Sequence, residues 1–177
     1  LYEQVGEDAY TQGFEVITTI DGDRQLAANK SLVDGLENYY DKRHGYRGPS
    51  TSYPPEFYTE SNTNALDAWT EELQGVPEYG NQKAAIVVDV QDQSFRAMLR
   101  SGETVAVNWE GISWAYTFRS RNEAWPPPET ASDAVSIGDL IRVRNTDDGW
   151  ELGQVPEIQG ALVSMSPSNG EIIALVG

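Results

Sequence analysis

The sequence contains no cysteine and only one histidine, His44. Without cysteine there are no disulfides, no thiol nucleophile and no thiolate zinc site. A catalytic triad would have to use His44, which lies in the turn-like stretch "DKRHGYRGP" beside Gly45, so we interpret it as non-catalytic. The acidic turn "NTDDGWE" does not extend into a calcium-binding loop. The sequence therefore predicts no metal site and no cofactor.

Basic residues are scarce as well: 12 lysines and arginines stand against 28 acidic residues, a net charge of −16. Phosphate backbones and anionic membrane surfaces are bound through basic patches, so we expect no nucleic acid as a partner. The charge suits a partner that is neutral or basic in places. The acidic residues are spread along the chain, which is typical of a solvated surface. A pair of catalytic carboxylates for glycoside hydrolysis stays open only because acids are abundant.

Long apolar runs are also absent, and none approaches the roughly 18 residues of a membrane span. Shorter periodic stretches predict two helices. One begins at Asp21 or Asp23, and one covers residues 62–74. Apolar residues that share a helix face are Leu26, Val33, Leu36 and Tyr40 in the first helix, and Leu66, Trp69 and Leu73 in the second.

The remaining segments read mostly as strands, separated by turn residues. Expected strands cover residues 13–20, 84–90, 94–99, 104–109 and 111–118, followed by a hairpin within 138–155 that turns at Asp147-Asp148-Gly149. A second hairpin pairs Ala161–Met165 with Ile172–Val176 around an Asn-Gly turn. Several short strands at regular spacing predict a small barrel or sandwich. An isolated hairpin is marginal in water, so we expect the last strands to pair with another segment.

Aromatic residues gather before a long loop, "RSRNEAWPPPETAS", that contains three consecutive prolines. Trp109 and Trp114 are best interpreted as core residues. Trp125 lies beside the prolines, where an aromatic residue serves equally well as a local clamp or as an interface anchor. The candidate partner-binding residues are Tyr116, Arg119, Arg121, Trp125, Pro126 and Pro127.

Several stretches together resemble one protein family. These are "GFEVITTIDGDRQLAA" with Gln25, "YYDKRHGYRGP", and "PEIQGALVSMSPSNGEIIALVG" at the end of the chain. They are similar to the region between the two catalytic domains of class A penicillin-binding proteins of Gram-negative bacteria. The stretch between them resembles the OB-like domain that such proteins insert there. The resemblance covers nearly the whole chain through independent motifs.

The resemblance implies an α+β fold: a small antiparallel OB-like β-barrel with two peripheral helices, closed at its base by a terminal β-hairpin or sheet. Residues 1–22 and 157–177 would be linker strands at the edge of the transpeptidase domain. Residues 23–82 would form a helical and loop segment, and residues 83–156 the OB-like barrel. In the family the last strand continues into the transpeptidase domain, so we expect an excised module in which Val16–Ile20 pairs with the terminal hairpin.

Such a parent would be a bifunctional peptidoglycan synthase with glycosyltransferase and penicillin-sensitive transpeptidase activities. This chain lacks the catalytic motifs: no serine has lysine at the third following position, and no lysine is followed by Thr-Gly. Ser120-Arg121-Asn122 matches the Ser-x-Asn tripeptide alone, which we interpret as chance. We therefore expect a non-catalytic fragment that penicillin does not acylate.

In relatives, the inserted region is where an outer-membrane lipoprotein activator docks, and this is the leading functional hypothesis. Two alternatives stay open: an OB fold that binds peptidoglycan strands, and a structural spacer between the catalytic domains. The parent's own glycosyltransferase and transpeptidase domains are further expected partners. The resemblance implies a periplasmic location within an inner-membrane-anchored protein whose anchor lies outside these residues.

Overall fold

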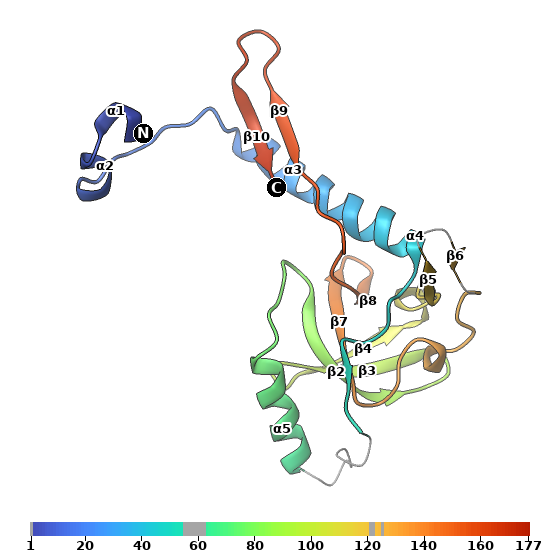
Figure 1. Ribbon diagram of the computed structural model, residues 1–177. Coiled ribbons are helices and arrows are strands. Elements are labelled where there is room, and N and C mark those ends of the chain that lie inside the picture. The colour runs from blue at the N-terminus through green and yellow to red at the C-terminus, as the bar shows by residue number, and fades with distance from the viewer. Residues whose placement is uncertain (1, 55–62, 121–122, 125) are drawn as a thin grey trace. The chain divides into compact units, whose positions relative to one another are not determined.

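The computed structural model describes residues 2–54, 63–120, 123–124 and 126–177 of the 177-residue chain. The chain divides into two compact units (Figure 1). The first comprises Leu1–Leu32 and Gly160–Gly177, and the second comprises Val33–Gln159. Among the residues described, no helix is both long enough and apolar enough to cross a membrane. The three-part division expected from the sequence stays a prediction.

The second unit is built on a sheet that closes on itself (Figure 1). Its strands follow the order β7, β2, β3, β4, β8, and β8 pairs again with β7. Their bounds are β2 (Lys83–Val90), β3 (Ser94–Leu99), β4 (Thr104–Asn108), β7 (Asp139–Thr146) and β8 (Gly149–Gly153). A short strand, β1 (Thr51–Ser52), adds to the free part of β7. The predicted α+β fold is confirmed, with a closed ring of strands.

One pairing departs from the antiparallel expectation. Strands β4 and β8 run parallel where Val107 faces Trp150. The reason is topological: β8 returns antiparallel beside its hairpin partner β7, and in that direction it meets β4 in parallel. This contact closes the ring.

The strands of the ring carry two apolar clusters. In β4, the inward Val105 and Val107 alternate with exposed residues. Strand β2 is buried on both faces, because helix α5 (Thr63–Gln74) covers its outer side with Trp69 and Leu73. The interior cluster contains, among others, Val87, Phe95, Ile112, Ile141, Val143 and Leu152. Truncating a fully buried residue such as Leu73 to alanine would cost about 2–5 kcal/mol.

The first long helix buries only part of the apolar face that its sequence predicts. Helix α3 (Gly22–Asp34) is followed by a π-helix, η1 (Gly35–Asp41), and a short turn of helix, α4 (Lys42–His44). Leu26 and Val33 are 69% and 42% exposed. The buried side chains of η1 are instead Glu37 and Asp41. Leu36 and Tyr40 are half-buried, so the apolar-face prediction was wrong only for Leu26 and Val33. The buried side chains of η1 are charged groups that find partners of opposite charge.

The strand expected over residues 111–118 is wrong for most of its length, and the strand expected over residues 104–109 ends at Asn108. Trp109–Gly111 form a 3₁₀ turn, η3, and the chain turns again at Ile112 and Ala115, both buried. The amide of Ser113 donates to the carbonyl of Trp109 over 2.8 Å. Trp109 and Trp114 are half-buried and pack against the interior cluster. Alternation of apolar and small residues arises here from a folded turn at the end of the ring.

In the first unit, the predicted terminal hairpin is present as β9 (Leu162–Met165) and β10 (Ile172–Val176). Gln25 of α3 pairs its side-chain amide with β10: it donates to the carbonyl of Leu175 over 2.8 Å and accepts from the Leu175 amide over 2.9 Å. Asp21 donates its amide to the carbonyl of Ile173. These bonds occupy the outer edge of β10.

The predicted strand over residues 13–20 is therefore wrong. This stretch makes no ladder, and it follows two short helices, α1 (Tyr2–Val5) and α2 (Asp8–Thr11). Its contact with β10 is one bond from the Thr19 hydroxyl to the carbonyl of Ile172, 2.6 Å long. The β-branched composition favoured a strand, but Gln25 and Asp21 take the backbone partners that a strand would need.

Gly45 ends the α4 turn and lets the chain return to the ring. It has φ +94°, and an added Cβ would lie 2.5 Å from the carbonyl oxygen of Tyr116. That close approach allows the backbone of Tyr46 to pair with Tyr116 and Phe118, over 2.8 and 2.9 Å. Only glycine fits both conditions.

We predict that Gly45→Ala lowers the free energy of unfolding of the second unit by about 2–3 kcal/mol, since it combines backbone strain with a collision. Gly48→Ala is the matched control, because Gly48 has φ +89° but open space around it. Denaturant titration followed by circular dichroism would measure both. Equal losses of unfolding free energy in the two variants would show that the contact between Gly45 and Tyr116 is not tight.

Candidate functional site

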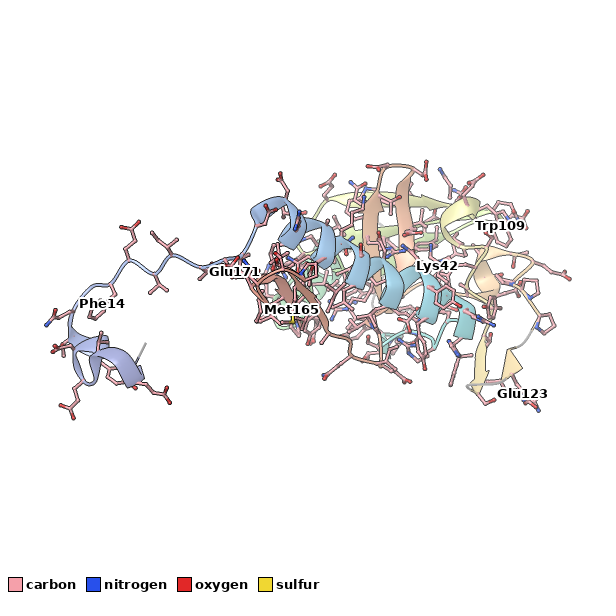
Figure 2. The ribbon with its side chains drawn as sticks, turned by 90° about the horizontal axis from the view of Figure 1, so that it is seen from above. Phe14, Lys42, Trp109, Glu123, Met165 and Glu171 are labelled. Atoms are coloured by element: carbon pink, nitrogen blue, oxygen red, sulfur yellow. The ribbon has the colours of Figure 1, made fainter. Side chains whose placement is uncertain are left out.

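The predicted partner-binding residues fall around a small hairpin of the second unit. Strands β5 (Phe118–Ser120) and β6 (Glu123–Ala124) pair with each other and, within the described residues, with no other strand. Arg119 is exposed and its Nε lies 3.4 Å from a carboxylate oxygen of Glu123. In Figure 2, Glu123 lies near the outer end of this hairpin, away from Lys42 and Trp109. Arg121 and Trp125 lie outside the described residues.

The proline segment after the hairpin divides into an exposed and an anchored part. Pro126 and Pro127 are exposed, whereas Pro128 is buried. A capping box then begins the 3₁₀ turn η4 (Ala131–Asp133). The amide of Ala131 donates to the carbonyl of Asp92, which lies in the turn between β2 and β3. The far end of the loop is therefore fixed to the ring, while its first two prolines remain accessible.

Asp133 organises the end of this loop. One of its carboxylate oxygens accepts the amides of Thr130 and Glu129, over 2.8 and 2.9 Å, and the Thr130 hydroxyl over 3.1 Å. These bonds favour the ionised form and hold the pKa of Asp133 below its ordinary value. The anchored conformation thus depends on this charge.

Tyr116 is placed differently from the other predicted residues. It is half-buried, and its hydroxyl donates to the carbonyl of Lys42. Burial raises the pKa of Tyr116, and the charge of Arg43 acts against that rise. With its backbone paired to Tyr46, this tyrosine ties α4 to the start of the hairpin. The structure brings Arg119, Pro126 and Pro127 to the surface and gives Tyr116 a positioning role.

Sequence reasoning missed a buried charge cluster, which we define as Glu37, Lys42, Gln82, Arg144 and Glu151. The guanidinium of Arg144 contacts carboxylates of both Glu37 and Glu151 and the side-chain oxygen of Asn38. Lys42 adds an ion pair to Glu151 of 2.8 Å. Gln82 donates to Glu37 over 2.9 Å. The side chain of Arg144 is only 5% exposed, so this is an interior cluster.

A second pair lies next to the cluster. Arg47 contacts both carboxylate oxygens of the buried Asp41, over 2.9 and 3.3 Å, and donates to the carbonyl of Val155. Gln154 accepts the amide of Arg47 and donates to the carbonyl of Gly45. These contacts explain the residue types in "YYDKRHGYRGP". The available signal was Glu37 and Asp41, one helical turn apart, within a set of acidic residues that as a group indicates a solvated surface.

The cluster offers little reactive chemistry. Its charged members are paired with one another, and no group of three or more His, Cys, Asp or Glu suited to a metal occurs within the described part of the chain. His44 donates its Nδ1–H to the backbone carbonyl of Tyr40 over 2.7 Å, and its imidazole packs on the Tyr40 ring. Two buried polar atoms, the Tyr46 hydroxyl and the Gln82 Oε1, have no partner among described residues. The geometry is that of a structural joint.

Comparison with known proteins shows which family this chain belongs to. Residues 46–158 match the penicillin-binding protein OB-like domain family. This chain belongs to the penicillin-binding proteins. Penicillin-binding protein 1A of Pseudomonas aeruginosa is 40% identical over 173 residues, which is 97% of this chain and 20% of that protein. Penicillin-binding protein 1A of Escherichia coli is 38% identical over 177 residues, 100% of this chain and 20% of that protein.

A solved structure supports the same assignment. The crystal structure of penicillin-binding protein 1A from Haemophilus influenzae matches 99% of this chain and 24% of its own, with a TM-score of 0.73 and 28% identity. The chain thus spans about a fifth of the length of the curated relatives it matches. The family suggested by the sequence motifs is confirmed, and the ring of strands is the OB-like domain of a penicillin-binding protein.

We predict that Arg144→Met destabilises the OB-like domain by about 3–5 kcal/mol, because it leaves the buried carboxylate of Glu37 without a counter-charge, while Glu151 keeps only its pair with Lys42. Arg96→Met is the control, since the Arg96–Asp89 pair of 3.2 Å is half exposed and should contribute about 1 kcal/mol or less. Urea titration of both variants measures the difference. Similar losses would indicate that the Arg144 pairs contribute no more than a surface pair.

A second prediction concerns acid. A depressed folded-state pKa means that Asp133 stabilises the loop above its ordinary pKa of 3.8, and that this contribution is lost as pH falls through the lower folded value. Asp133→Asn should remove that part of the acid dependence, whereas Asp148→Asn, in the exposed β7–β8 turn, should not. NMR titration of the Glu129 and Thr130 amide signals would report the ionisation of Asp133 directly. Amide shifts that titrate identically in the Asp133 variant would contradict this assignment.

Proposed function

We propose that this chain is a non-catalytic docking module of a bifunctional peptidoglycan synthase. The parent would carry the glycosyltransferase and penicillin-sensitive transpeptidase activities, and would be held in the periplasm by an inner-membrane anchor. The observation that carries the proposal is the match of residues 46–158 to an OB-like domain, within a chain that spans about a fifth of its relatives. The buried charge cluster adds support, since its charged members pair with one another.

The β5–β6 hairpin and the exposed prolines form the surface we propose for docking. Among the strands that the structure describes, the hairpin pairs with no other, and Arg119 and Glu123 are 62% and 63% exposed. Its base is fixed on one side by Tyr116 and on the other by the capping box at Asp133. A fixed base beneath the exposed Arg119 and Glu123 lowers the ordering cost of binding. The proposed partner is an outer-membrane lipoprotein activator.

The net charge of −16 shapes how such a partner would approach. A partner with basic patches would be steered toward the module, and raised salt would slow its association. Steering by charge does not hold a complex together, so the holding energy would come from apolar and stacking contacts at the loop. Trp125 and the prolines beside it supply that chemistry in the sequence.

The test is capture from a detergent-solubilised envelope of the source organism on the immobilised chain, with mass spectrometry. We predict retention of a single outer-membrane lipoprotein that elutes at raised salt. Trp125→Ala should reduce the amount retained about tenfold or more if it is an anchor. Arg119→Ala should weaken capture, whereas Arg96→Ala on β3 should not. A column that retains nothing, or variants that retain as much as the native chain, would favour the glycan-binding or spacer alternatives.

A further inference from the structure

A cavity of about 490 Å³ lies in the second unit, remote in sequence from the β5–β6 hairpin. It is formed where β2 begins, β3 ends and β4 begins. Its lining residues are Gln74, Glu78, Lys83, Leu99, Arg100, Ser101, Glu103 and Trp150. This volume is within the range of small-molecule sites, roughly 300–1,000 Å³. None of these residues belongs to the buried charge cluster or the proposed docking surface.

The residues that form the walls of the cavity are held by hydrogen bonds that leave its interior open. Arg100 donates to the carbonyls of Leu73 and Val76, at the end of helix α5. The β3–β4 turn is closed by the amide of Glu103 donating to the Ser101 hydroxyl and by a 2.8 Å bond from the Leu99 amide to the Glu103 carbonyl. The site is therefore preformed on a helix end and three strand ends.

The charges around the cavity cancel. Lys83 pairs with Glu78 over 2.9 Å. Arg100 and Glu103 add one charge of each sign to the lining, and Glu103 makes no ion pair within the described residues. Burial raises the pKa of Glu78, but the hydrogen bond and charge of Lys83, together with Arg100, lower it overall, so the carboxylate is ionised. In a protein of net charge −16, this is a locally neutral site. It favours an uncharged polar ligand over a phosphate or an acidic peptide.

Trp150, the aromatic residue in the lining, narrows the class of ligand further. Trp150 is half-buried in β8, opposite Val107 of β4 and Asn145 of β7. Beside it the cavity presents amide, hydroxyl and carboxylate groups, from Gln74, Ser101 and Glu103. A sugar ring has an apolar C–H face that packs on an aromatic ring and hydroxyls that exchange hydrogen bonds around its rim. OB folds are known to bind oligosaccharides.

We propose that this cavity binds a neutral pyranose unit of a glycan strand, with Trp150 as the stacking surface and Glu103 and Gln74 as hydrogen-bonding partners. The site is independent of the docking surface at Arg119, so either proposal can fail without the other. It would give the module a second ligand, close to the polymer that the proposed parent builds.

The test uses N-acetyl chitotetraose and the 177-residue chain, with binding measured by NMR titration and calorimetry. We expect saturable binding with a dissociation constant below about 1 mM. Trp150→Phe should weaken it about tenfold, while the matched Trp109→Phe, which also replaces a half-buried tryptophan packed on the core, should leave it unchanged. Binding lost equally in both variants would overturn the proposal.

Rim variants keep the proposal testable if the Trp150 variant does not fold. Glu103→Gln and Gln74→Ala change exposed side chains and should each weaken sugar binding several-fold. Glu110→Gln removes an exposed charge in the η3 turn and should have no effect. Absence of binding by the native chain up to about 10 mM sugar, or rim variants that bind like the native chain, would overturn the assignment.

Discussion

The contact of Arg144 with Glu37 and Glu151 is the interaction on which the second unit depends. Arg144 lies on β7, Glu151 on β8 and Glu37 on the π-helix, so one guanidinium joins the helical segment to both strands that close the ring. Ion pairs of this kind add little net stability over apolar packing, but removing one member leaves a buried charge. Their value is therefore geometric: a change of register between helix and ring would separate these charged groups from their partners.

The remaining features follow from that joint. Asp41 and Arg47 form a second pair at the end of the same segment, and Gly45 turns the chain between them. The backbone of Tyr46 then meets Tyr116, directly before the β5–β6 hairpin. A chain of defined contacts thus runs from the charge cluster to the base of the proposed docking surface. A binding surface on such a base needs little ordering when a partner arrives.

The sequence predicted the ring strands and the terminal hairpin because their apolar residues alternate and polar turns separate them. It failed where a local pattern had two solutions. Glu37 and Asp41 look like solvent-facing helix residues until Arg144 and Arg47 are placed opposite them. Residues 13–20 have strand composition, but the side chain of Gln25 occupies the edge they would use. Such outcomes depend on partners distant in the chain, which periodicity does not encode.

The candidate site was predictable to a similar degree. The exposed Arg119, Pro126 and Pro127 follow from a proline-rich loop without periodicity, whereas the inward position of Tyr116 required the pairing with Tyr46. The cavity at Trp150 had no signal in the sequence, because its walls come from four separate segments.

Native-state hydrogen exchange of the second unit tests the central claim most directly. If the charge cluster couples the π-helix to the ring, the amides of Gly35–Asp41 and those of β7 and β8 will open together, with the same free energy and the same denaturant dependence. Exchange of the π-helix amides through an opening several kcal/mol below that of the strands would contradict it, and would show that the helix is attached to the ring without being part of its cooperative unit.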